Sequence, residues 1–219
     1  MINGFIFGLD RILVNMAVLH FQAWRRLAEE RGAKFTWEEF NQVQDLSPRA
    51  AMDLIFEEND LTEQETQQGI KQVNQYFHEH ILGLSPEQVL PGVEPLLKEL
   101  HQGEIKIGLG SASKEAQTVL EALGLSHLFD VIEAGHLVER GKVEPDLLLS
   151  VVHQLGAKPE NCVAVEADAE GIEAARRAGM YAVGIGYPAG LPGADVVYPS
   201  LRDVTLKLIK RDLDTARPY

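Results

Sequence analysis

The feature that most constrains the fold is an alternation of short apolar segments with amphipathic ones from about residue 93 onward. The apolar segments are "IKIGLG", "FDVIEAG", "CVAVEA", "YAVGIG" and "ADVVYPS", and helical patterns such as "VEPLLKELHQG" and "AEGIEAARRAGM" lie between them. Short apolar strands that alternate with helices are typical of βαβ units, whose strands pair in parallel. We therefore predict a parallel sheet, in which ligands bind beyond the carboxyl ends of the strands.

The first third of the chain has a different pattern. Residues 4–9, "GFIFGL", are predicted to be a strand because the run is short and apolar. The next segment, "AVLHFQAWRRLAEERG", has helical spacing and ends at Gly32, and the pattern stays helical and polar from Phe35 to Leu84. The prediction is an α/β fold, with an all-helical segment inserted after the first strand of a doubly wound, Rossmann-like parallel-sheet core.

Charge and composition exclude several classes of function. The 20 Lys and Arg against 33 Asp and Glu give a net charge of -13, which argues against a phosphate-neutralising surface for nucleic acid. A small cationic pocket for a phosphorylated ligand is compatible with this charge. Neither a signal-peptide pattern nor an apolar stretch of membrane-spanning length is present in the sequence, so we expect a cytoplasmic protein with no membrane partner.

The single cysteine, Cys162, excludes an intramolecular disulfide and suits a reducing cytosol. It lies in the predicted strand "CVAVEA". A reactive thiol is one interpretation, but free cysteine is among the most buried residue types. We therefore favour a small buried strand residue.

Polar residues gather at the predicted strand ends, where parallel strands meet one edge of the sheet. They are Gly8 and Asp10 at the first, Ser111 in "GSASK", Lys142 in the loop "RGKVEPD", and Glu166 and Asp168 in "VEADAEG". Hydroxyl and ammonium groups hold phosphate oxygens, and carboxylates hold Mg²⁺, so the combination suits phosphoryl chemistry. The Ser111 loop also precedes a predicted helix over 114–125, whose first amides favour an anion. Taken singly, such a serine is usually a helix cap and such a lysine is usually solvated.

With these motifs, and with "HFQAWRRLAEERG", "SPEQVLPGVEPLLKEL" and "GIEAARRAGM", the chain resembles the haloacid dehalogenase superfamily, most closely its β-phosphoglucomutase branch. The resemblance covers nearly the whole chain. It implies a core of residues 1–14 and 86–219 with a helical cap of residues 15–85. It also implies Mg²⁺-dependent phosphoryl transfer, as a phosphomutase or phosphatase, with a small phosphorylated metabolite or inorganic phosphate as ligand.

The first motif of that superfamily is F-D-x-D-G, in which the first Asp attacks phosphorus and binds Mg²⁺ and the second is the general acid/base. Here the run is Phe7-Gly8-Leu9-Asp10-Arg11. The resemblance therefore implies acid/base chemistry for Asp10, whereas the nucleophile position is Gly8. Because the backbone fixes this point, we expect no neighbour to supply a carboxylate there.

The other motifs are partly kept. The resemblance implies that Ser111 holds the phosphoryl group, that Lys142 neutralises it, and that Ala112 and Lys114 contact the substrate. The fourth motif has adjacent Glu and Asp as metal ligands; this chain has them separated, as Glu166, Ala167 and Asp168. Asp168 would reach a metal from a flexible loop but would point the other way from an extended segment.

In the implied cap, His20, Trp24 and Arg49 match positions for substrate handling and sugar-phosphate binding. The residues alone also allow a half-buried helix histidine, a packing tryptophan and an exposed helix arginine. For Trp24, packing is the favoured interpretation.

Arg11 stands where the motif has glycine, and two interpretations are open. Its guanidinium partly replaces Mg²⁺ as a fixed cation, or it points to solvent or pairs with a surface acid. With Gly8 and Ala167, two carboxylates of a Mg²⁺ site are missing. We predict a catalytically impaired protein that retains binding of phosphate, a sugar phosphate or a protein partner. The alternative is an active phosphomutase or phosphatase with a non-standard site.

Overall fold

The structure is a computed structural model that describes residues 2–44, 46–56, 61–135 and 145–216. It separates into two compact units, one of Met1–Asn15 with Ser85–Tyr219 and one of Met16–Leu84. We call them the α/β unit and the helical unit, and each is described by itself. No helix among the described residues combines the length and apolar character that crossing a bilayer requires.

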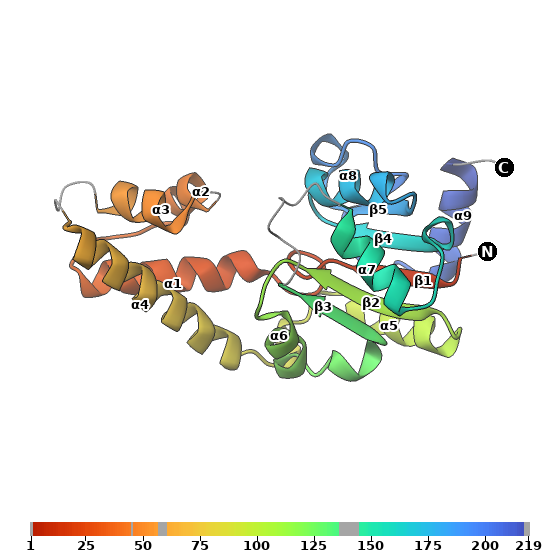
Figure 1. Cartoon of the computed structure of the whole chain (residues 1–219), viewed down its shortest axis with the longest axis horizontal. Coiled ribbons are helices and arrows are strands. Elements are labelled where there is room, and N and C mark those ends of the chain that lie inside the picture. Colours follow the sequence, from red (N-terminus) through yellow and green to blue (C-terminus); the bar gives the residue numbers. More distant parts are fainter. Residues whose placement is uncertain (1, 45, 57–60, 136–144, 217–219) are drawn as a thin grey trace. The chain divides into compact units, whose positions relative to one another are not determined.

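The α/β unit is built on a six-stranded sheet in which all neighbouring strands pair in parallel (Figure 1). The strand order is β3-β2-β1-β4-β5-β6, which confirms the predicted parallel sheet. The strands are β1 (Gly4–Phe7), β2 (Lys106–Ser111), β3 (Val131–Ala134), β4 (Cys162–Glu166), β5 (Tyr181–Ile185) and β6 (Val196–Tyr198).

Helices cover this sheet, as the alternating sequence pattern predicts. They are α5 (Val93–Gln102), α6 (Ala116–Ala122), α7 (Asp146–Gln154), α8 (Ala169–Arg177) and α9 (Leu206–Ala216). Apolar residues of α7 and α8 form one core cluster with Ile6 of β1 and Ala164 of β4. Since successive strand residues face opposite sides, Phe5 and Phe7 point away from that cluster, and both are fully buried. The sheet is therefore covered on both faces.

The helical unit consists of α1 (Met16–Glu30), α2 (Trp37–Val43), α3 (Pro48–Ile55) and α4 (Glu63–Leu82), with no strand among its described residues. Its core contains mainly aromatic and large aliphatic side chains, including Trp24, Phe40 and Met52. Both α2 and α4 begin with a capping box, at Thr36 and Thr62, in which side-chain and backbone groups satisfy each other's hydrogen bonds.

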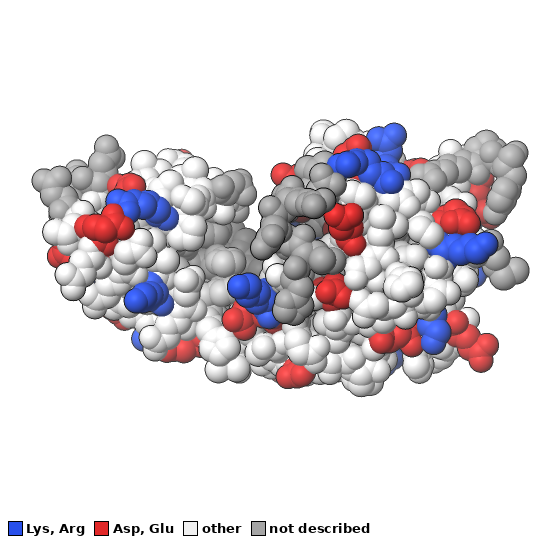
Figure 2. All heavy atoms as spheres, in the orientation of Figure 1, with Lys and Arg blue, Asp and Glu red and all other residues white. Residues whose placement is uncertain are grey.

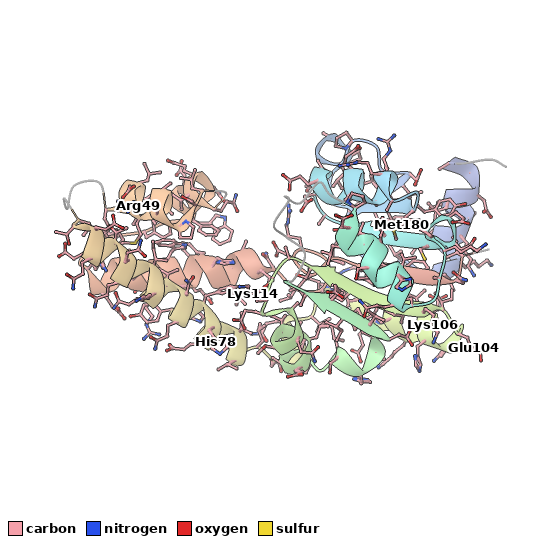
Figure 3. All side chains as sticks on the ribbon, viewed as in Figure 1. Arg49, His78, Glu104, Lys106, Lys114 and Met180 are labelled. Carbon is pink, nitrogen blue, oxygen red and sulfur yellow. The ribbon has the colours of Figure 1, made fainter. Side chains whose placement is uncertain are left out.

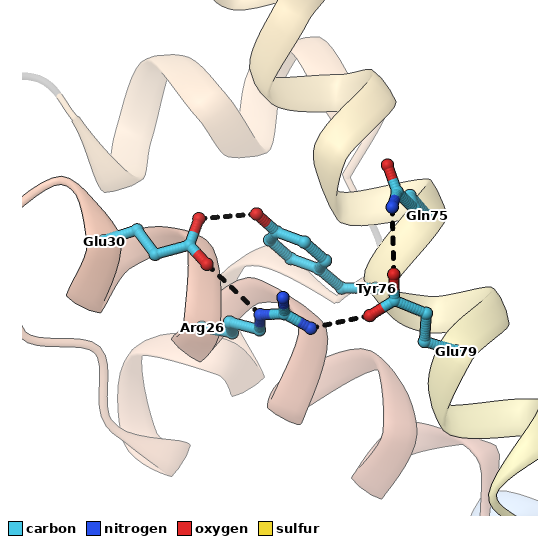
Figure 4. Close-up of polar contacts among 5 residues, drawn as sticks. All are labelled: Arg26, Glu30, Gln75, Tyr76 and Glu79. Atoms are coloured by element: carbon cyan, nitrogen blue, oxygen red, sulfur yellow. Dashed lines mark hydrogen bonds and ion pairs between the residues drawn. The ribbon is translucent and has the colours of Figure 1, made fainter.

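A polar network joins α1 to α4 on the surface of the helical unit (Figure 4). Arg26 donates to Glu30 at 3.2 Å and to Glu79 at 2.7 Å, and its guanidinium lies 3.8 Å from the centre of the Tyr76 ring. The Tyr76 hydroxyl donates to Glu30 at 2.5 Å, and Gln75 donates to Glu79 at 2.9 Å. The charged side chains are about half exposed, so each ion pair adds little stability, whereas Tyr76 is buried.

Other predictions are confirmed or corrected at the level of single residues. Cys162 is fully buried in β4, as favoured, and burial raises the pKa of its thiol to about 11. The first strand ends at Phe7 instead of residue 9, because the chain enters a turn after Gly8. On the face drawn in Figure 2, described basic side chains lie in small groups beside acidic ones.

Candidate active site

Gly8 directly follows β1 at the carboxyl edge of the sheet. Its N–H donates to the Val165 carbonyl at 3.0 Å, and Phe7 pairs with Val165, so Gly8 lies beside Glu166 at the end of β4. A Cβ atom at Gly8 would lie only 2.7 Å from Oε2 of Glu166. The Glu166 side chain therefore lies beside the space that Gly8 leaves, while position 8 itself has no carboxylate.

Two glycines make room for the Glu166 carboxyl group. A Cβ at Gly171, in α8, would lie 2.7 Å from Oε2 and 2.8 Å from Cδ of Glu166. Side chains at positions 8 and 171 would thus both crowd the same carboxyl group. Burial, and to a smaller extent the nearby charge of Asp168, raise the pKa of Glu166 to about 8. At neutral pH this carboxyl group is therefore largely protonated.

Asp10 and Arg11 lie in a tight turn after β1. Arg11 has φ of +60°, a left-handed conformation that glycine adopts without strain and arginine rarely adopts. Its N–H donates to the Val14 carbonyl at 2.8 Å, and Asp10 forms an isolated bridge with Val14. The turn therefore holds the backbone of both charged residues in place.

The Arg11 side chain pairs with two acids of the site. Its Nε lies 3.9 Å from Oδ2 of Asp10, and its Nη2 lies 3.5 Å from Oδ2 of Asp168. This arrangement is the pairing with surface acids that the second interpretation includes, and the two acids belong to the candidate site. The groups are about half exposed, so each pair alone is weak. Together they place a positive charge between carboxylates from two neighbouring strand ends.

Asp168 is the N-cap of α8, with an extended backbone at φ −140° and ψ 163°. Its Oδ1 accepts a hydrogen bond from the Gly171 N–H at 2.8 Å, and its Oδ2 faces Arg11. This is the extended case of the two that the sequence left open. Both oxygens have partners within the protein, which argues against the expected metal role for this residue.

Ser111 is the last residue of β2 and is 9% exposed. Its Oγ accepts from the Ser113 N–H at 3.2 Å, and Oγ of Ser113 in turn accepts from the Glu115 N–H at 3.2 Å. These turns delay the start of α6 to Ala116, so the predicted helix over 114–125 is shorter than expected. The Ser111 hydroxyl is therefore fixed by the loop and lies well before the first turn of the helix.

Two further predicted substrate residues lie in the loop that follows Ser111. Ala112 and Lys114 are exposed, and the Lys114 stem lies so close to Gly135 that a Cβ there would be 2.7 Å from Cγ of the lysine (Figure 3). Lys142, the predicted phosphate-neutralising residue, lies outside the described residues.

The implied Mg²⁺ does not fit the described donor set. Across residues 2–135 and 145–216, apart from 45 and 57–60, no group of three or more His, Cys, Asp or Glu side chains is placed to hold a metal ion. Of the expected ligands, Asp168 caps a helix and Glu166 lies in the gap beside Gly8. The Arg11 guanidinium, a cation, already lies beside Asp10 and Asp168.

The three predicted substrate residues of the helical unit have partners within that unit. The His20 ring is exposed and stacks on Phe77, with centroids 3.8 Å apart. Trp24 is buried in the core of the unit. Arg49 (Figure 3) pairs with Glu63 and lies 3.9 Å from Oδ2 of Asp53. The bond to Glu63 raises the pKa of Arg49 and lowers that of Glu63.

The sequence did not indicate a cavity that adjoins the Arg11 turn. It has a volume of about 250 Å³ and is lined by Arg11, Asn15 and Ser200 together with apolar residues such as Ile12, Pro91 and Leu201. It lies at one end of the α/β unit, between the turn after β1 and the loop after β6. No motif marks Ser200, so only the fold brings it beside Arg11 and Asn15.

Comparison with known proteins agrees with this architecture. A family model for haloacid dehalogenase-like hydrolases matches residues 2–179. The β-phosphoglucomutase of Bacillus subtilis (strain 168) is 33% identical over 97% of this chain and 96% of its own length. A phosphorylated carbohydrates phosphatase of Thermotoga maritima is 29% identical over 80% and 81%. The crystal structure of β-phosphoglucomutase from Clostridium difficile has a TM-score of 0.80 and 32% identity, and covers 98% of both chains.

Proposed function

The chain belongs to the haloacid dehalogenase-like hydrolases and is β-phosphoglucomutase-like, and on this premise we propose that its phosphoryl transfer is impaired while it still binds phosphate or a sugar phosphate. Members of this family bind phosphorylated sugars and phosphate, and its phosphatases and mutases generally use Mg²⁺. In this chain the attacking carboxylate and the metal ligands differ from the family motif, so we propose that ligand binding is retained and phosphoryl transfer is not.

The observation that carries the proposal is the contact between Gly8 and Glu166. Position 8 has no side chain, and the carboxyl group that fills the adjoining space belongs to β4 and is largely protonated at neutral pH. A protonated carboxyl group is a poor nucleophile, because it has lost the negative charge of the carboxylate. Loss of a nucleophile that acts in concert with other groups costs roughly 10⁶-fold in rate in a well-studied protease.

In this proposal the remaining residues bind the ligand. Ser111 donates its hydroxyl proton to a phosphate oxygen, Lys142 neutralises the phosphate, and Ala112 and Lys114 form the loop around it. Asp10 keeps the acid/base position without an aspartyl phosphate to act on. Support comes from Ser111, which is buried and held by its loop at the sheet edge where Gly8 and Glu166 lie.

We also propose that residues 15–85 act as a cap on a core of residues 1–14 and 86–219. In this assignment His20 and Arg49 belong to the substrate side of the cap, whereas Trp24, the third predicted substrate residue, packs in the core of the cap. For Arg49 to bind a sugar phosphate, its pair with Glu63 would have to open, because both groups share that bond. The ligand class is a hexose phosphate or inorganic phosphate; a protein partner is the remaining option.

The test uses purified protein with Mg²⁺ and β-glucose 1-phosphate, and separately p-nitrophenyl phosphate. We expect no turnover above a blank and no phosphoryl adduct on the intact protein by mass spectrometry. Binding of β-glucose 1-phosphate or phosphate, measured by calorimetry, is expected to persist and to weaken in Ser111→Ala.

Contamination by an active phosphatase is controlled by the variant Asp10→Asn, purified in the same way. Turnover that disappears in this variant would show that the site is active and would overturn the proposal. A phosphorylated Glu166 located by peptide mapping would do the same, because it would identify that residue as a substitute nucleophile.

A further inference from the structure

The charge of this site differs from that of the family motif by a definite amount. Counted as formal charges, with every Asp and Glu taken as ionised, Gly8 removes one negative charge and Arg11 adds one positive charge, whereas Ala167 and Asp168 together leave the sum unchanged. The total change of two positive charges equals the charge of one Mg²⁺ ion. A divalent ion added to the present residues would therefore leave the site more positive than a family member with its metal bound.

The geometry places the added charge between the acids. The Arg11 guanidinium lies 3.9 Å from Oδ2 of Asp10 and 3.5 Å from Oδ2 of Asp168. Both separations exceed the usual N–H···O hydrogen-bond length, so these contacts attract the guanidinium without saturating its five donors. A guanidinium that retains donors is well suited to bind a phosphate oxygen, because its fork matches phosphate geometry.

The backbone keeps Arg11 in this position at a cost. Its φ of +60° is unfavourable for arginine, and the turn is closed by its N–H bond to the Val14 carbonyl. The side chain also lines the cavity of about 250 Å³ that contains Asn15 and Ser200, which supply an amide and a hydroxyl. A small anion in this cavity would meet the Arg11 guanidinium and neutral polar groups, because Asp10 and Asp168, which pair with Arg11, are not part of the cavity lining.

We propose that Arg11 takes the place of the metal as the fixed cation of this site, and that the site binds phosphate anions without Mg²⁺. This inference rests on the proposed function, since it requires that phosphate binding is retained. It goes beyond that function by assigning the cation to the protein itself and by making binding independent of the metal.

The first arm of the test titrates the protein with Mg²⁺ alone, in a calorimeter. We expect no saturable binding at millimolar Mg²⁺. Saturable binding to the unmodified protein would overturn the inference, because the cation position would then be open to a metal.

The second arm titrates inorganic phosphate in EDTA and again in excess Mg²⁺. We expect the same dissociation constant in both buffers, and a loss of about tenfold or more in Arg11→Met, because a hydrogen bond from a charged donor is removed. The matched control is Arg25→Met. Arg25 is equally exposed and pairs with Glu29 at 2.7 Å, but lies in the helical unit, so affinity is expected to stay unchanged.

The outcomes separate the two proposals. Phosphate binding that requires Mg²⁺, or that is equally strong in Arg11→Met, would overturn the role of Arg11 and leave the proposed function intact. Absence of phosphate binding in both buffers would overturn the retained site and the inference with it. If Arg11→Met folds poorly, Arg11→Gly replaces it, because a φ of +60° is unstrained for glycine.

Discussion

The substitution Gly8→Asp tests the central contact of the site. It would restore a carboxylate at the end of β1, with its Cβ 2.7 Å from Oε2 of Glu166. That distance is too short for a non-bonded contact, but the obstacle is the end of a flexible side chain, which can rotate away. The lasting cost is therefore electrostatic. Two carboxylates about 4 Å apart repel by about 4 kcal/mol at an effective dielectric constant of about 20.

The repulsion should depend on pH, because the pKa of Glu166 is raised to about 8. At about pH 6 the pair shares one proton and most of the repulsion is avoided. At about pH 9 the folded variant avoids the full repulsion by keeping Glu166 protonated about one pH unit above its pKa, which costs about 1.4 kcal/mol. We expect Gly8→Asp to lower the free energy of unfolding by about 1 kcal/mol at the lower pH and by about 2–3 kcal/mol at the higher pH.

The assay is urea unfolding of the unmodified protein, Gly8→Asp and Gly8→Asn at the two pH values. Asparagine has the same shape as aspartate without the charge, so its cost should be nearly independent of pH. If the Asp and Asn variants lose the same stability at both pH values, Glu166 is not the charged neighbour of position 8. The reasoning about the site would then fail at its first step.

Three further predictions concern single side chains. The folded pKa of Glu166 lies above its unfolded value, so the free energy of unfolding should fall as pH rises from about 5 to about 8, and Glu166→Gln should flatten this dependence in urea titrations. Cys162 is fully buried and the pKa of its thiol is raised to about 11, so a thiol-specific reagent should react with it in urea but hardly in the native protein. Trp24 lies in the core of the helical unit, so Trp24→Ala should cost about 3–5 kcal/mol in thermal or urea unfolding; a loss below about 1 kcal/mol would contradict the packing role.

The sequence predicts most of the fold because its signals are local. Short apolar strands and amphipathic helices recur in order, and each predicted segment is found as a strand or helix. The predicted ends of strands and helices are less accurate where a side-chain hydrogen bond or an unusual backbone φ determines where the element begins or ends. The first strand stops at Phe7 because the turn through Arg11 follows, and α6 starts late because Ser111 and Ser113 close hydrogen-bonded turns first.

The candidate site is predictable in composition but not in geometry. The sequence predicts that Asp10, Ser111 and Glu166 lie at one edge of the sheet, because the carboxyl ends of parallel strands meet at the same edge. That the Glu166 carboxyl enters the gap beside Gly8 depends on the register of β1 with β4 and on the second glycine, Gly171. These contacts join residues more than 150 positions apart, so no local pattern indicates them.

The proposed absence of a metal has an electrostatic consequence for this site. A cluster of carboxylates without a metal repels itself, so such a site is stable only if that repulsion is reduced in another way. Here one carboxyl group is removed, at Gly8, and another is largely protonated at neutral pH, at Glu166. The remaining pair, Asp10 and Asp168, has Arg11 beside it. If these changes act together, then restoring Asp at position 8 alone should destabilise the protein, whereas restoring it together with Arg11→Gly should make stability depend on Mg²⁺, because the ion would again be needed to offset the acids.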